Sequence, residues 1–354
     1  MISSSCSFSV AGRDVGPDAP CFVIAELSAN HNGSLERAFA SVRAAADAGA
    51  DAIKLQSYRP DTITMRSDRP EFVVPGDGPW AGRTLYDLYD EAHLPWEWHA
   101  PIFEEAKRRG IIAFSTPFDH TAIDLLESLD APLYKIASFE LIDDDLIRHV
   151  ASLRKPMIMS TGMASLEEIL HAISVAREAG GNDIVLLKCT SSYPAPDDSM
   201  NLRTLPALAE ATGCLVGLSD HSMGTVASIV ATTLGACVIE KHFTLSRADG
   251  GVDSHFSLEP QELRQLVEEV RRTRQMLGSV RFGPGASDEG SVVFRRSLYA
   301  VADIAPGEVL TRDNVRSIRP GHGLAPRYLD LVLGRKATRT VPRGTPIDWS
   351  QITV

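Results

Sequence analysis

The chain has 354 residues and a mass of 38.4 kDa, the size of about two average domains. Its 35 lysines and arginines stand against 46 aspartates and glutamates, and the net charge of −11 argues against a broad surface for nucleic acid or an anionic membrane. Hydrophobic residues make up 44%, enough for a full core, and no stretch approaches the ~20 apolar residues of a membrane-spanning helix.

The first twenty residues show little pattern, and we expect a short β or disordered lead-in over residues 1–20. They contain neither the basic leader nor the apolar segment of a secretory signal. The five cysteines, at positions 6, 21, 189, 214 and 237, are odd in number and show no C-x-x-C spacing. This usage favours reduced thiols in a cytoplasmic protein over a disulfide framework or a zinc ribbon.

From residue 21 onward, short apolar runs alternate with longer amphipathic segments. The apolar runs predict strands at 22–26, 52–56, 111–115, 133–136, 156–160, 184–188, 215–219 and 238–242. The amphipathic segments predict helices near 35–48, 96–109, 121–129, 144–152, 166–179, 202–210, 224–234 and 260–277. Eight strand–helix units over residues 21–278 predict a (β/α)8 TIM barrel, since a doubly wound sheet would usually stop at five or six.

The end of the chain has a different character. Residues 279–290 are rich in Gly, Ser and Pro and predict a linker, and residues 291–354 predict a small β-rich domain of short strands and turns. An internal near-repeat relates Ile304, Gly307, Leu310 and Val315 to Val341, Gly344, Ile347 and Ile352. The repeat predicts a pseudo-symmetric domain, although hairpin turns alone can also produce such spacing.

Polar residues follow nearly every predicted strand, where a hydrophobic core would reject them. Because active sites of such barrels lie at the C-terminal ends of the strands, this pattern predicts a functional site there. Four lysines at or beside these ends predict a cationic funnel for a small anion, with solvated rim charges as the alternative: Lys54, Lys135, Lys188 and Lys241. Hydroxyls would complete a cradle for phosphate and carboxylate: Thr116, Ser138, Ser160 and Ser219.

Two histidines end the seventh and eighth predicted strands, which are neighbours in a closed barrel. His221 and His242 can share one divalent ion, and Asp220 and Glu240 beside them favour a metal site over structural histidines. Glu26, at the end of the first strand, is the candidate general acid or base, because burial would raise its pKa. A covalent hydrolase is disfavoured, since no Gly-x-Ser-x-Gly elbow occurs and Cys189 has no evident histidine partner.

Eight dispersed motifs resemble the sialic acid synthase family: IAELSANHNGS (24–34), DAIKLQSY (51–58), FSTPFD (114–119), YKIASFE (134–140), MSTGMAS (159–165), LLKCTSSYPAP (186–196), GLSDHSMG (217–224) and VIEKHFTLSRADGGVDSHFSLEP (238–260). The tail resembles the family's antifreeze-like (SAF) domain through FRRSLYAV (294–301) and VRSIRPGHGL (315–324). Members of this family condense phosphoenolpyruvate with an N-acetylated amino sugar to give a nine-carbon 2-keto acid. The resemblance therefore implies a TIM-barrel synthase with a C-terminal SAF domain.

The resemblance also implies a role for individual residues. Phosphoenolpyruvate contacts fall on Lys54, Thr116, Lys135, Ser138, Ser160 and Ser219. Metal ligands fall on His221 and His242, with Mn2+ expected first and Mg2+ or Co2+ as alternatives. Sugar contacts fall on Gln56, Glu140, Tyr193 and Asp253, and on Arg319 of the tail, which reaches over the neighbouring active site to an acetamido group. A homodimer in which each tail domain covers the partner's barrel is implied as well.

The implied chemistry begins when the divalent ion polarises the aldehyde of the open-chain sugar and C3 of phosphoenolpyruvate attacks it. Water adds at C2 and inorganic phosphate leaves. The lysines would hold the anion in near-attack geometry, which is where most of the rate should originate. Glu26 would manage the proton of the attacking water or of the new hydroxyl.

An aromatic segment bears on the identity of the sugar. Trp80, Trp96 and Trp98 lie within nineteen residues, alongside Tyr86 and Tyr89, in the connection after the second strand. Aromatic faces suit a sugar whose C6 is a methyl group, and simple packing of the following helix is the alternative. This segment and SRADGGVDS (246–254) resemble the branch of the family that makes pseudaminic acid from 2,4-diacetamido-2,4,6-trideoxy-L-altrose.

Other functions stay open on the sequence. Within the family, the alternatives are synthesis of N-acetylneuraminate or of legionaminate. A related synthase that acts on a phosphorylated aldose would need a second phosphate site and would leave the tail domain unexplained. In a different class, the chain would be a non-catalytic carbohydrate-binding protein. No nucleic-acid or membrane partner is expected.

Overall fold

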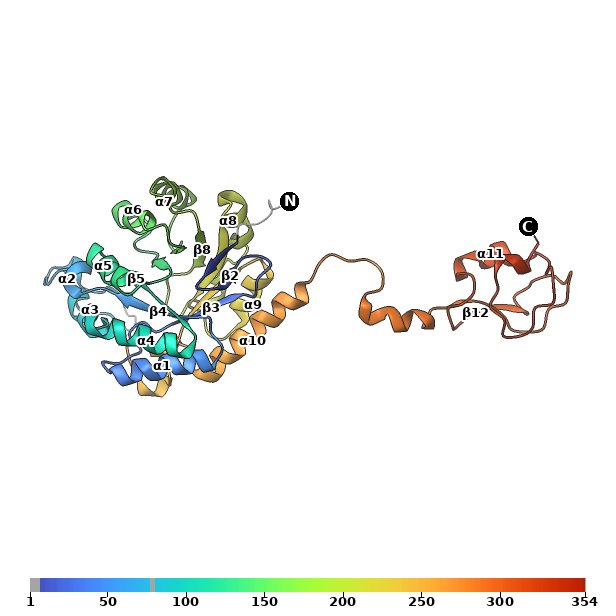
Figure 1. Cartoon of the computed structure of the whole chain (residues 1–354), viewed down its shortest axis with the longest axis horizontal. Coiled ribbons are helices and arrows are strands. Elements are labelled where there is room, and N and C mark those ends of the chain that lie inside the picture. Colours follow the sequence, from blue (N-terminus) through green and yellow to red (C-terminus); the bar gives the residue numbers. More distant parts are fainter. Residues whose placement is uncertain (1–6, 77–79, 354) are drawn as a thin grey trace. The chain divides into compact units, whose positions relative to one another are not determined.

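The structure, a computed structural model, describes residues 7–76 and 80–353. The chain divides into two compact units, Met1–Gly278 and Ser279–Val354 (Figure 1). Residues 1–6 of the expected lead-in lie outside the described residues, and so does Cys6. Within the described part of the chain, no helix has both the length and the apolar character needed to cross a membrane.

Eight parallel strands of the first unit close into a barrel in the order β10-β3-β4-β5-β6-β7-β8-β9. They are β3 (Phe22–Glu26), β4 (Ala52–Ser57), β5 (Ile112–Pro117), β6 (Tyr134–Ile136), β7 (Met157–Ser160), β8 (Ile184–Cys189), β9 (Leu215–Asp220) and β10 (Val238–His242). Each coincides with a predicted strand to within two residues at either end. The predicted TIM barrel is therefore confirmed.

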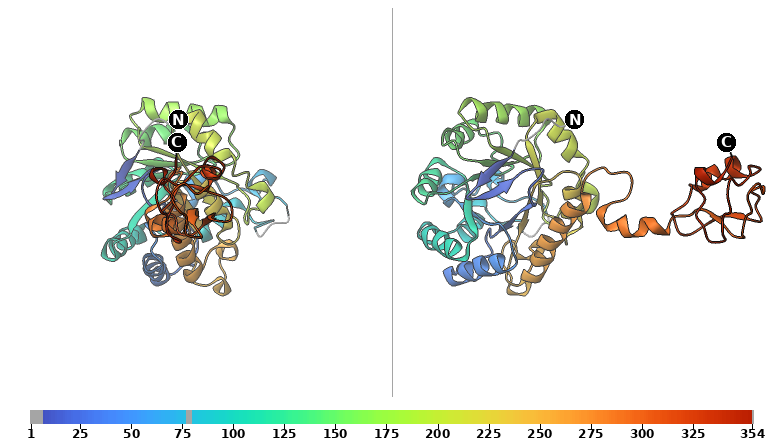
Figure 2. Two further views of the ribbon diagram at one scale, coloured as in Figure 1. Left: turned by 90° about the vertical axis from the view of Figure 1, so that its right-hand side faces the viewer. Right: turned by 45° about the vertical axis from the view of Figure 1, so that its right-hand side comes forward.

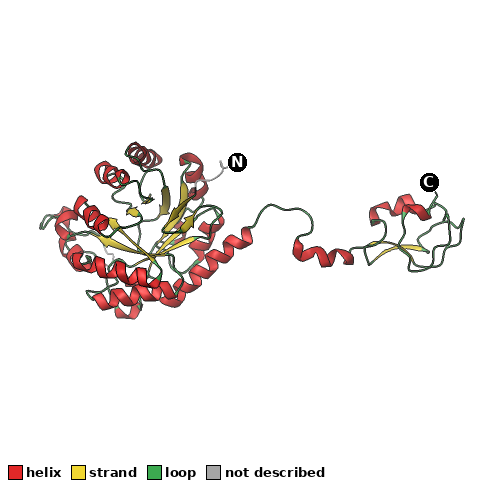
Figure 3. Cartoon of the chain, in the orientation of Figure 1, coloured by secondary structure: helices red, strands yellow, loops and turns green. Residues whose placement is uncertain are grey.

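Helices surround the barrel strands on the outside (Figures 2 and 3). They are α1 (Leu35–Asp47), α4 (His99–Arg109), α5 (His120–Ser128), α6 (Asp144–Ser152), α7 (Leu166–Glu178), α8 (Thr204–Thr212), α9 (Val226–Thr233) and α10 (Pro260–Leu277). Two short helices, α2 (Pro60–Ile63) and α3 (Leu85–Ala92), lie in the long connection after β4. Local chemistry sets the helix ends: Ser34 caps α1 by accepting from the Arg37 amide, and Gly110 ends α4 with a φ of 68°.

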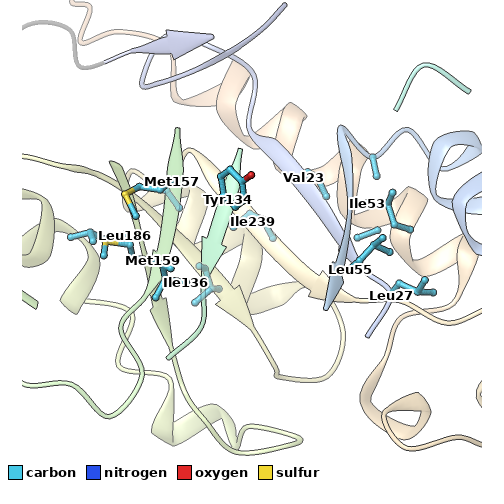
Figure 4. Packing of buried hydrophobic residues seen from close by; sticks show 14 of the residues in the cluster. Val23, Leu27, Ile53, Leu55, Tyr134, Ile136, Met157, Met159, Leu186 and Ile239 are labelled. Carbon is cyan, nitrogen blue, oxygen red and sulfur yellow. The ribbon is translucent and has the colours of Figure 1, made fainter. Parts of the chain in front are cut away.

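Two-residue alternation along the strands builds two core layers. One layer packs between strands and helices and includes Val23, Ile53, Ile136 and Met159 (Figure 4). The residues next to these in sequence face the barrel interior, and this inner cluster contains Phe22, Ile24, Ala52, Phe114, Ile158, Leu187 and Val238. The side of the strand on which a residue lies therefore decides whether it can reach the barrel mouth.

The described part of the lead-in is a β-hairpin, β1 (Phe8–Val10) paired antiparallel with β2 (Arg13–Val15). Val10 and Val15 are buried in the same cluster as the first residues of several barrel strands. The hairpin therefore closes the N-terminal end of the barrel. Arg13 adds an ion pair to the barrel, with its Nη1 lying 2.5 Å from Asp51 Oδ1.

The tail unit contains the antiparallel pair β11 (Ser297–Ala300) and β12 (Val315–Ile318) and the short helix α11 (Leu329–Val332). Its single apolar core draws equivalent residues from both halves of the sequence repeat: Ile304 and Val341, Leu310 and Ile347, Val315 and Ile352. Gly307 and Gly344 both adopt positive φ, of 81° and 85°. The segment predicted as a linker is partly ordered, because a 3-10 helix runs over Ala286–Phe294.

Candidate active site

Inward-facing polar residues from neighbouring strands meet at the C-terminal end of the barrel. Lys54 of β4 lies at the centre, with its Nζ 2.7 Å from Glu26 Oε2 of β3 and 3.4 Å from Glu240 Oε1 of β10. The same ammonium donates to Thr116 Oγ1 of β5 at 3.2 Å. All four side chains are buried. Four strands of the barrel thus bring one cation and two carboxylates together in a buried position.

A second buried ammonium group extends this cluster across the barrel. Lys135 Nζ of β6 donates to Ser160 Oγ of β7 at 2.7 Å and lies 3.9 Å from Glu240 Oε1. Ser219 Oγ of β9 donates to the same carboxylate oxygen at 3.2 Å. Glu240 therefore joins both lysines, a central place that the sequence analysis missed. Two-residue alternation from His242, which ends the same strand, would have found it.

The two carboxylates respond differently to their surroundings. Burial raises the pKa of Glu26 to about 7, although the nearby Lys54 ammonium acts to lower it. Burial also acts to raise the pKa of Glu240, but Lys135 and Lys54 outweigh it and hold that pKa below its usual value. Glu240 is thus the fixed anion of the cluster, and Glu26 is the group that can exchange a proton near neutral pH. The expected rise in the pKa of Glu26 is confirmed.

The two histidines lie side by side above this cluster. The ring centroids of His221 and His242 are 5.5 Å apart, and the Tyr193 ring packs 4.3 Å from that of His221. His221 Nδ1 lies 2.9 Å from the Thr190 carbonyl oxygen, which can only accept, so Nδ1 carries a proton, and the Ser219 hydroxyl lies 3.4 Å from Nε2. His242 Nδ1 is buried and has no hydrogen-bond partner among the described residues. Each ring therefore has a nitrogen lone pair when it is neutral.

These donors fit a divalent ion that has two imidazole ligands and open positions for substrate or water. Within the described residues, no group of three or more His, Cys, Asp or Glu side chains is arranged to hold a metal ion. Asp220, expected beside the histidines, is occupied elsewhere: its carboxylate accepts from Ser222 Oγ at 2.6 Å and from Ser228 Oγ at 2.7 Å. The candidate ligands in the described part of the chain are then the two histidines.

The predicted funnel of four lysines is wrong for two of them. Lys241 lies on the helix-facing side of β10, fully buried, with its Nζ 2.9 Å from Asp220 Oδ2. Lys188 likewise alternates away from the interior of β8 and donates to the Cys189 carbonyl at 2.7 Å. A residue at a strand end reaches the mouth only if its side chain points inward, as those of Lys54 and Lys135 do.

Comparison with known proteins gives this geometry a context. Residues 41–282 match the NeuB family, and residues 295–353 match the SAF domain. The chain belongs to the NeuB family. This is the sialic acid synthase family that the motifs resemble, and the predicted SAF domain is confirmed with it.

Relatives cover nearly the whole chain. Pseudaminic acid synthases of Campylobacter jejuni and Helicobacter pylori are 45% and 42% identical, each over 94% of this chain and over 97% and 98% of their own lengths. The N,N'-diacetyllegionaminic acid synthase of Legionella pneumophila is 35% identical over 95% of this chain and 96% of its own. A crystal structure of N-acetylneuraminic acid synthetase from Leptospira borgpetersenii matches with a TM-score of 0.73 and 31% identity, covering 81% of this chain and 95% of that one.

The other barrel residues implied by the family lie on β4 and in the loops around the cluster. Ser138 Oγ accepts from the Gly162 amide at 3.2 Å. Gln56 is half-buried on β4, two residues beyond Lys54. Glu140 follows β6, and burial raises its pKa to about 7. Asp253 is buried, with its Oδ2 lying 4.0 Å from His242 Nδ1.

Arg319 stands apart from this group because it belongs to the tail unit. It is exposed and follows β12 directly. The residues of the barrel site lie together within one unit, whereas any role for Arg319 requires the tail.

Cys189 does have a histidine neighbour, contrary to the expectation from sequence. Its Sγ lies 3.8 Å from His221 Nδ1. The two come from adjacent strands, β8 and β9, whose register pairs Cys189 with Ser219. Because that imidazole nitrogen donates to the Thr190 carbonyl, it has no lone pair to serve as a base for the thiol, and nucleophilic catalysis by Cys189 stays disfavoured.

The three tryptophans of the aromatic segment have separate roles. Trp80 Nε1 donates to the Val252 carbonyl at 3.2 Å, and its ring centroid lies 5.9 Å from that of Tyr193. Trp96 packs under the Arg59 guanidinium and Trp98 against the His31 ring. Trp80 thus contacts a residue above the cluster, whereas the described contacts of Trp96 and Trp98 are consistent with the packing alternative.

Proposed function

We propose that this chain is a pseudaminic acid synthase. It condenses phosphoenolpyruvate, 2,4-diacetamido-2,4,6-trideoxy-L-altrose and water to give pseudaminate and inorganic phosphate. The observation that carries the proposal is the buried cluster of Lys54, Lys135, Glu26 and Glu240 beneath two adjacent imidazoles, in a chain most of which aligns with synthases of this product. Synthesis of legionaminate or N-acetylneuraminate is the alternative within the same chemistry.

The lysines and hydroxyls would bind phosphoenolpyruvate. Lys54 and Lys135 provide buried ammonium groups for its phosphate and carboxylate, and the hydroxyl donors around them are Thr116, Ser138, Ser160 and Ser219. A substrate with several negative charges competes with Glu26 and Glu240 for the same ammonium groups. Its binding therefore favours protonation of the carboxylate with the higher pKa, Glu26.

Glu26 would then act on the proton of the reaction. A carboxyl group with a pKa of about 7 is present in both forms at neutral pH, which suits a general acid or base. We assign this task to its Oε2, which is buried and, among residues 7–76 and 80–353, contacts only the Lys54 ammonium. It takes the proton from the water that adds at C2, or supplies one to the new hydroxyl.

The sugar would lie above this cluster, against the open side of the mouth. Gln56, Glu140, Tyr193 and Asp253 are the proposed contacts from the barrel. The Tyr193 ring, tilted 35° to that of His221, presents an apolar face to the C–H groups of the sugar.

We propose that His221 and His242 hold a divalent ion, Mn2+ first and Mg2+ or Co2+ as alternatives. When bound there, the ion would supply Lewis-acid polarisation of the sugar aldehyde. The chain's own part is to keep His221 in the tautomer with a free Nε2, through the Thr190 carbonyl. The second available ligand atom is Nδ1 of His242, which is buried and has no hydrogen-bond partner in the described part of the chain.

We propose that the protein works as a homodimer in the cytoplasm, with each tail domain covering the partner's barrel and Arg319 reaching the sugar in trans. Exposed apolar side chains on both units support the dimer: Phe282 is 94% exposed in the tail unit, and Phe139 and Ile142 are 62% and 68% exposed near the barrel mouth. The cytoplasm is proposed because phosphoenolpyruvate is a metabolite of that compartment. Sedimentation of the full chain would test the dimer.

Phosphate release tests the function directly. With saturating phosphoenolpyruvate and Mn2+, we expect the highest kcat/KM with the altrose derivative, compared with N-acetylmannosamine and the mannose-configured diacetamido sugar. An apolar pocket separates methyl from hydroxymethyl by only ~1–3 kcal/mol, so some turnover of the other sugars is expected. Equal or faster turnover of N-acetylmannosamine would contradict the choice of sugar. No phosphate with any of the three would favour a carbohydrate-binding protein.

The metal proposal has its own test. Exhaustive chelation and His221→Ala or His242→Ala should each abolish turnover without unfolding the barrel, and each variant should purify with less bound metal than the wild type. His93→Ala is the matched control, because His93 is a half-buried residue directly after α3 whose Nδ1 contacts the Asp90 carbonyl. Full activity after chelation would refute the metal role.

A further inference from the structure

Ser28 occupies an unusual backbone conformation next to the site. It follows β3, it is buried, and its φ is 45°, in the left-handed region that glycine adopts without cost. Five residues later, at Gly33 with a φ of 68°, the chain does use glycine for the same conformation. A serine at position 28 therefore carries a backbone cost that glycine would avoid, and its side chain needs a compensating role.

The contacts of Ser28 supply that role. Its backbone amide donates to Glu26 Oε1 at 3.1 Å, and its hydroxyl donates to Asp253 Oδ2 in a very short hydrogen bond. The left-handed conformation turns both donors of one residue toward two different carboxylates. Glu26 and Asp253 come from opposite ends of the barrel sequence, so Ser28 is the residue that links them.

The segments on either side are tied together as well. Asn30 Nδ2 donates to Ser257 Oγ at 2.9 Å, and Ser257 Oγ donates to the Asp253 carbonyl at 2.6 Å. This connection lies where β10 meets β3, with His242 paired to Glu26 in the register. The main chain of Asp253 is therefore held by Ser257, and its carboxylate is held by the Ser28 hydroxyl and the Ala29 backbone amide.

We propose that Ser28 is a positioning residue for the sugar. Together with the Ala29 backbone amide, it would hold the Asp253 carboxylate in place for a donor hydroxyl or amide of the amino sugar and tie it to the segment that contacts Glu26. The inference rests on the proposed function, in which Asp253 contacts the sugar. It adds a residue that touches neither substrate and acts through Asp253.

Two substitutions separate the side chain from the backbone. Ser28→Gly removes the hydroxyl, keeps the amide that serves Glu26 and relieves the left-handed strain. Ser28→Ala removes the hydroxyl and keeps the strain. For both we expect kcat/KM for the sugar to fall about ten- to hundredfold, as for loss of a hydrogen bond to a charged group, mainly through a higher KM. The KM for phosphoenolpyruvate should stay within about twofold, because the Glu26 contact remains.

Stability should change little. In Ser28→Gly, relief of the left-handed strain offsets the lost hydrogen bond, so a melting temperature within a few degrees of the wild type would show that a loss of sugar affinity does not reflect unfolding. Asp130→Gly is the matched control, because Asp130 is an exposed residue at the end of α5 with a similar φ of 54°. That variant relieves the same strain far from the site and should leave both KM values unchanged.

The outcomes distinguish this inference from the proposed function. If the wild type turns over and both Ser28 variants keep its sugar KM, the inference is overturned and the function stands. If the wild type releases no phosphate with any of the sugars, the proposed function is wrong. A double-mutant cycle of Ser28→Gly with Asp253→Ala, measured by urea midpoints, then tests whether Ser28 and Asp253 are coupled. Non-additive midpoints would support it, and additive ones would overturn it.

Discussion

The two ends of the barrel interior differ in character although the same strands build both. On β3, Ile24 lies in the apolar inner cluster, and Glu26, two residues later, belongs to the charged one. On β5, Phe114 fills the interior, and Thr116 accepts from Lys54. A distance of two residues along a strand thus separates the part of the barrel that stabilises the fold from the part that carries the candidate chemistry.

The contrast between the two ends shows how the fold can bury a cluster of four charged side chains. Removing two lysines and two glutamates from water is costly, and that cost is offset only when the charges face one another with good geometry. Here Glu240 contacts both ammonium groups, and Glu26 avoids part of the cost through its raised pKa. Burial of apolar side chains at the other end, which the hairpin closes, offsets the free-energy cost of burying this charged cluster.

The strongest test of this division removes the central charge. Lys54→Met should lower kcat/KM by about 10³-fold or more, because phosphoenolpyruvate loses a buried ammonium and two carboxylates lose their counter-charge. Lys107→Met, at an exposed position on α4, is the control and should keep wild-type kinetics. Phosphate release under saturating sugar measures both. A Lys54→Met enzyme within tenfold of the wild type would place the phosphate site elsewhere.

The second test concerns the apolar end. Phe114→Ala should destabilise the barrel by about 3–5 kcal/mol, because Phe114 is fully buried and the cavity cannot collapse between strands. Activity per folded molecule should fall far less than in Lys54→Met, since Phe114 carries no charge, although it pairs with Lys54 in the register of β4 and β5. Urea unfolding followed by circular dichroism gives the first quantity and phosphate release the second. Lost activity with intact stability would contradict the division of the barrel into two ends.

Much of this division could be predicted from the sequence. Apolar runs predicted the strands, and polar residues after them predicted a site at the C-terminal end of the barrel. Both predictions succeed because each signal is local in the sequence. The error over Lys188 and Lys241 came from counting strand ends without asking on which face each side chain lies. Two-residue alternation, anchored on Phe22, Ile24 and Glu26, separates the inward positions from the outward ones and would have corrected it.

Other features depend on contacts that no local pattern shows. The sequence does not distinguish Trp80 from Trp96 and Trp98. The path of the long connection after β4 places Trp80 against Tyr193, and in the described structure the other two contact different residues. The bond between Ser28 and Asp253 joins residues 225 positions apart. The central place of Glu240 between two lysines depends on distances across the barrel, which follow from closure of the sheet.

A third test uses pH to probe the rim of the charged end. Burial raises the pKa of Glu140 from its ordinary 4.5 to about 7, so the folded state holds this proton more tightly than the unfolded one. Its contribution to stability is therefore full below pH 4.5 and is lost as pH rises through 7. Glu140→Gln should stabilise the protein by about 1–3 kcal/mol at pH 8 and by almost nothing at pH 4.5.

The control for that prediction is Glu104→Gln, at an exposed position on α4, which should shift stability equally at both pH values. Urea midpoints at pH 4.5 and pH 8 measure the difference. A Glu140 variant that is less stable than the wild type at pH 8 would mean that the folded protein stabilises the carboxylate, which would contradict the direction given for its pKa.

The smallest expected effect comes from the hairpin that closes the apolar end. Arg13→Ala removes the ion pair between Arg13 and Asp51, but Arg271 Nη2 still lies 3.1 Å from the same carboxylate. Because the Arg13 side chain is 40% exposed and its partner keeps a second cation, we expect a loss of only about 0.5–1 kcal/mol and unchanged kinetics. Arg69→Ala, which breaks the exposed pair with Glu71, should cost less still. Equal midpoints for the two variants would show that the ion pair adds nothing to the apolar packing of the hairpin, which includes Phe8, Val10 and Val15. A change in kcat would show that the closed end of the barrel is coupled to the charged one.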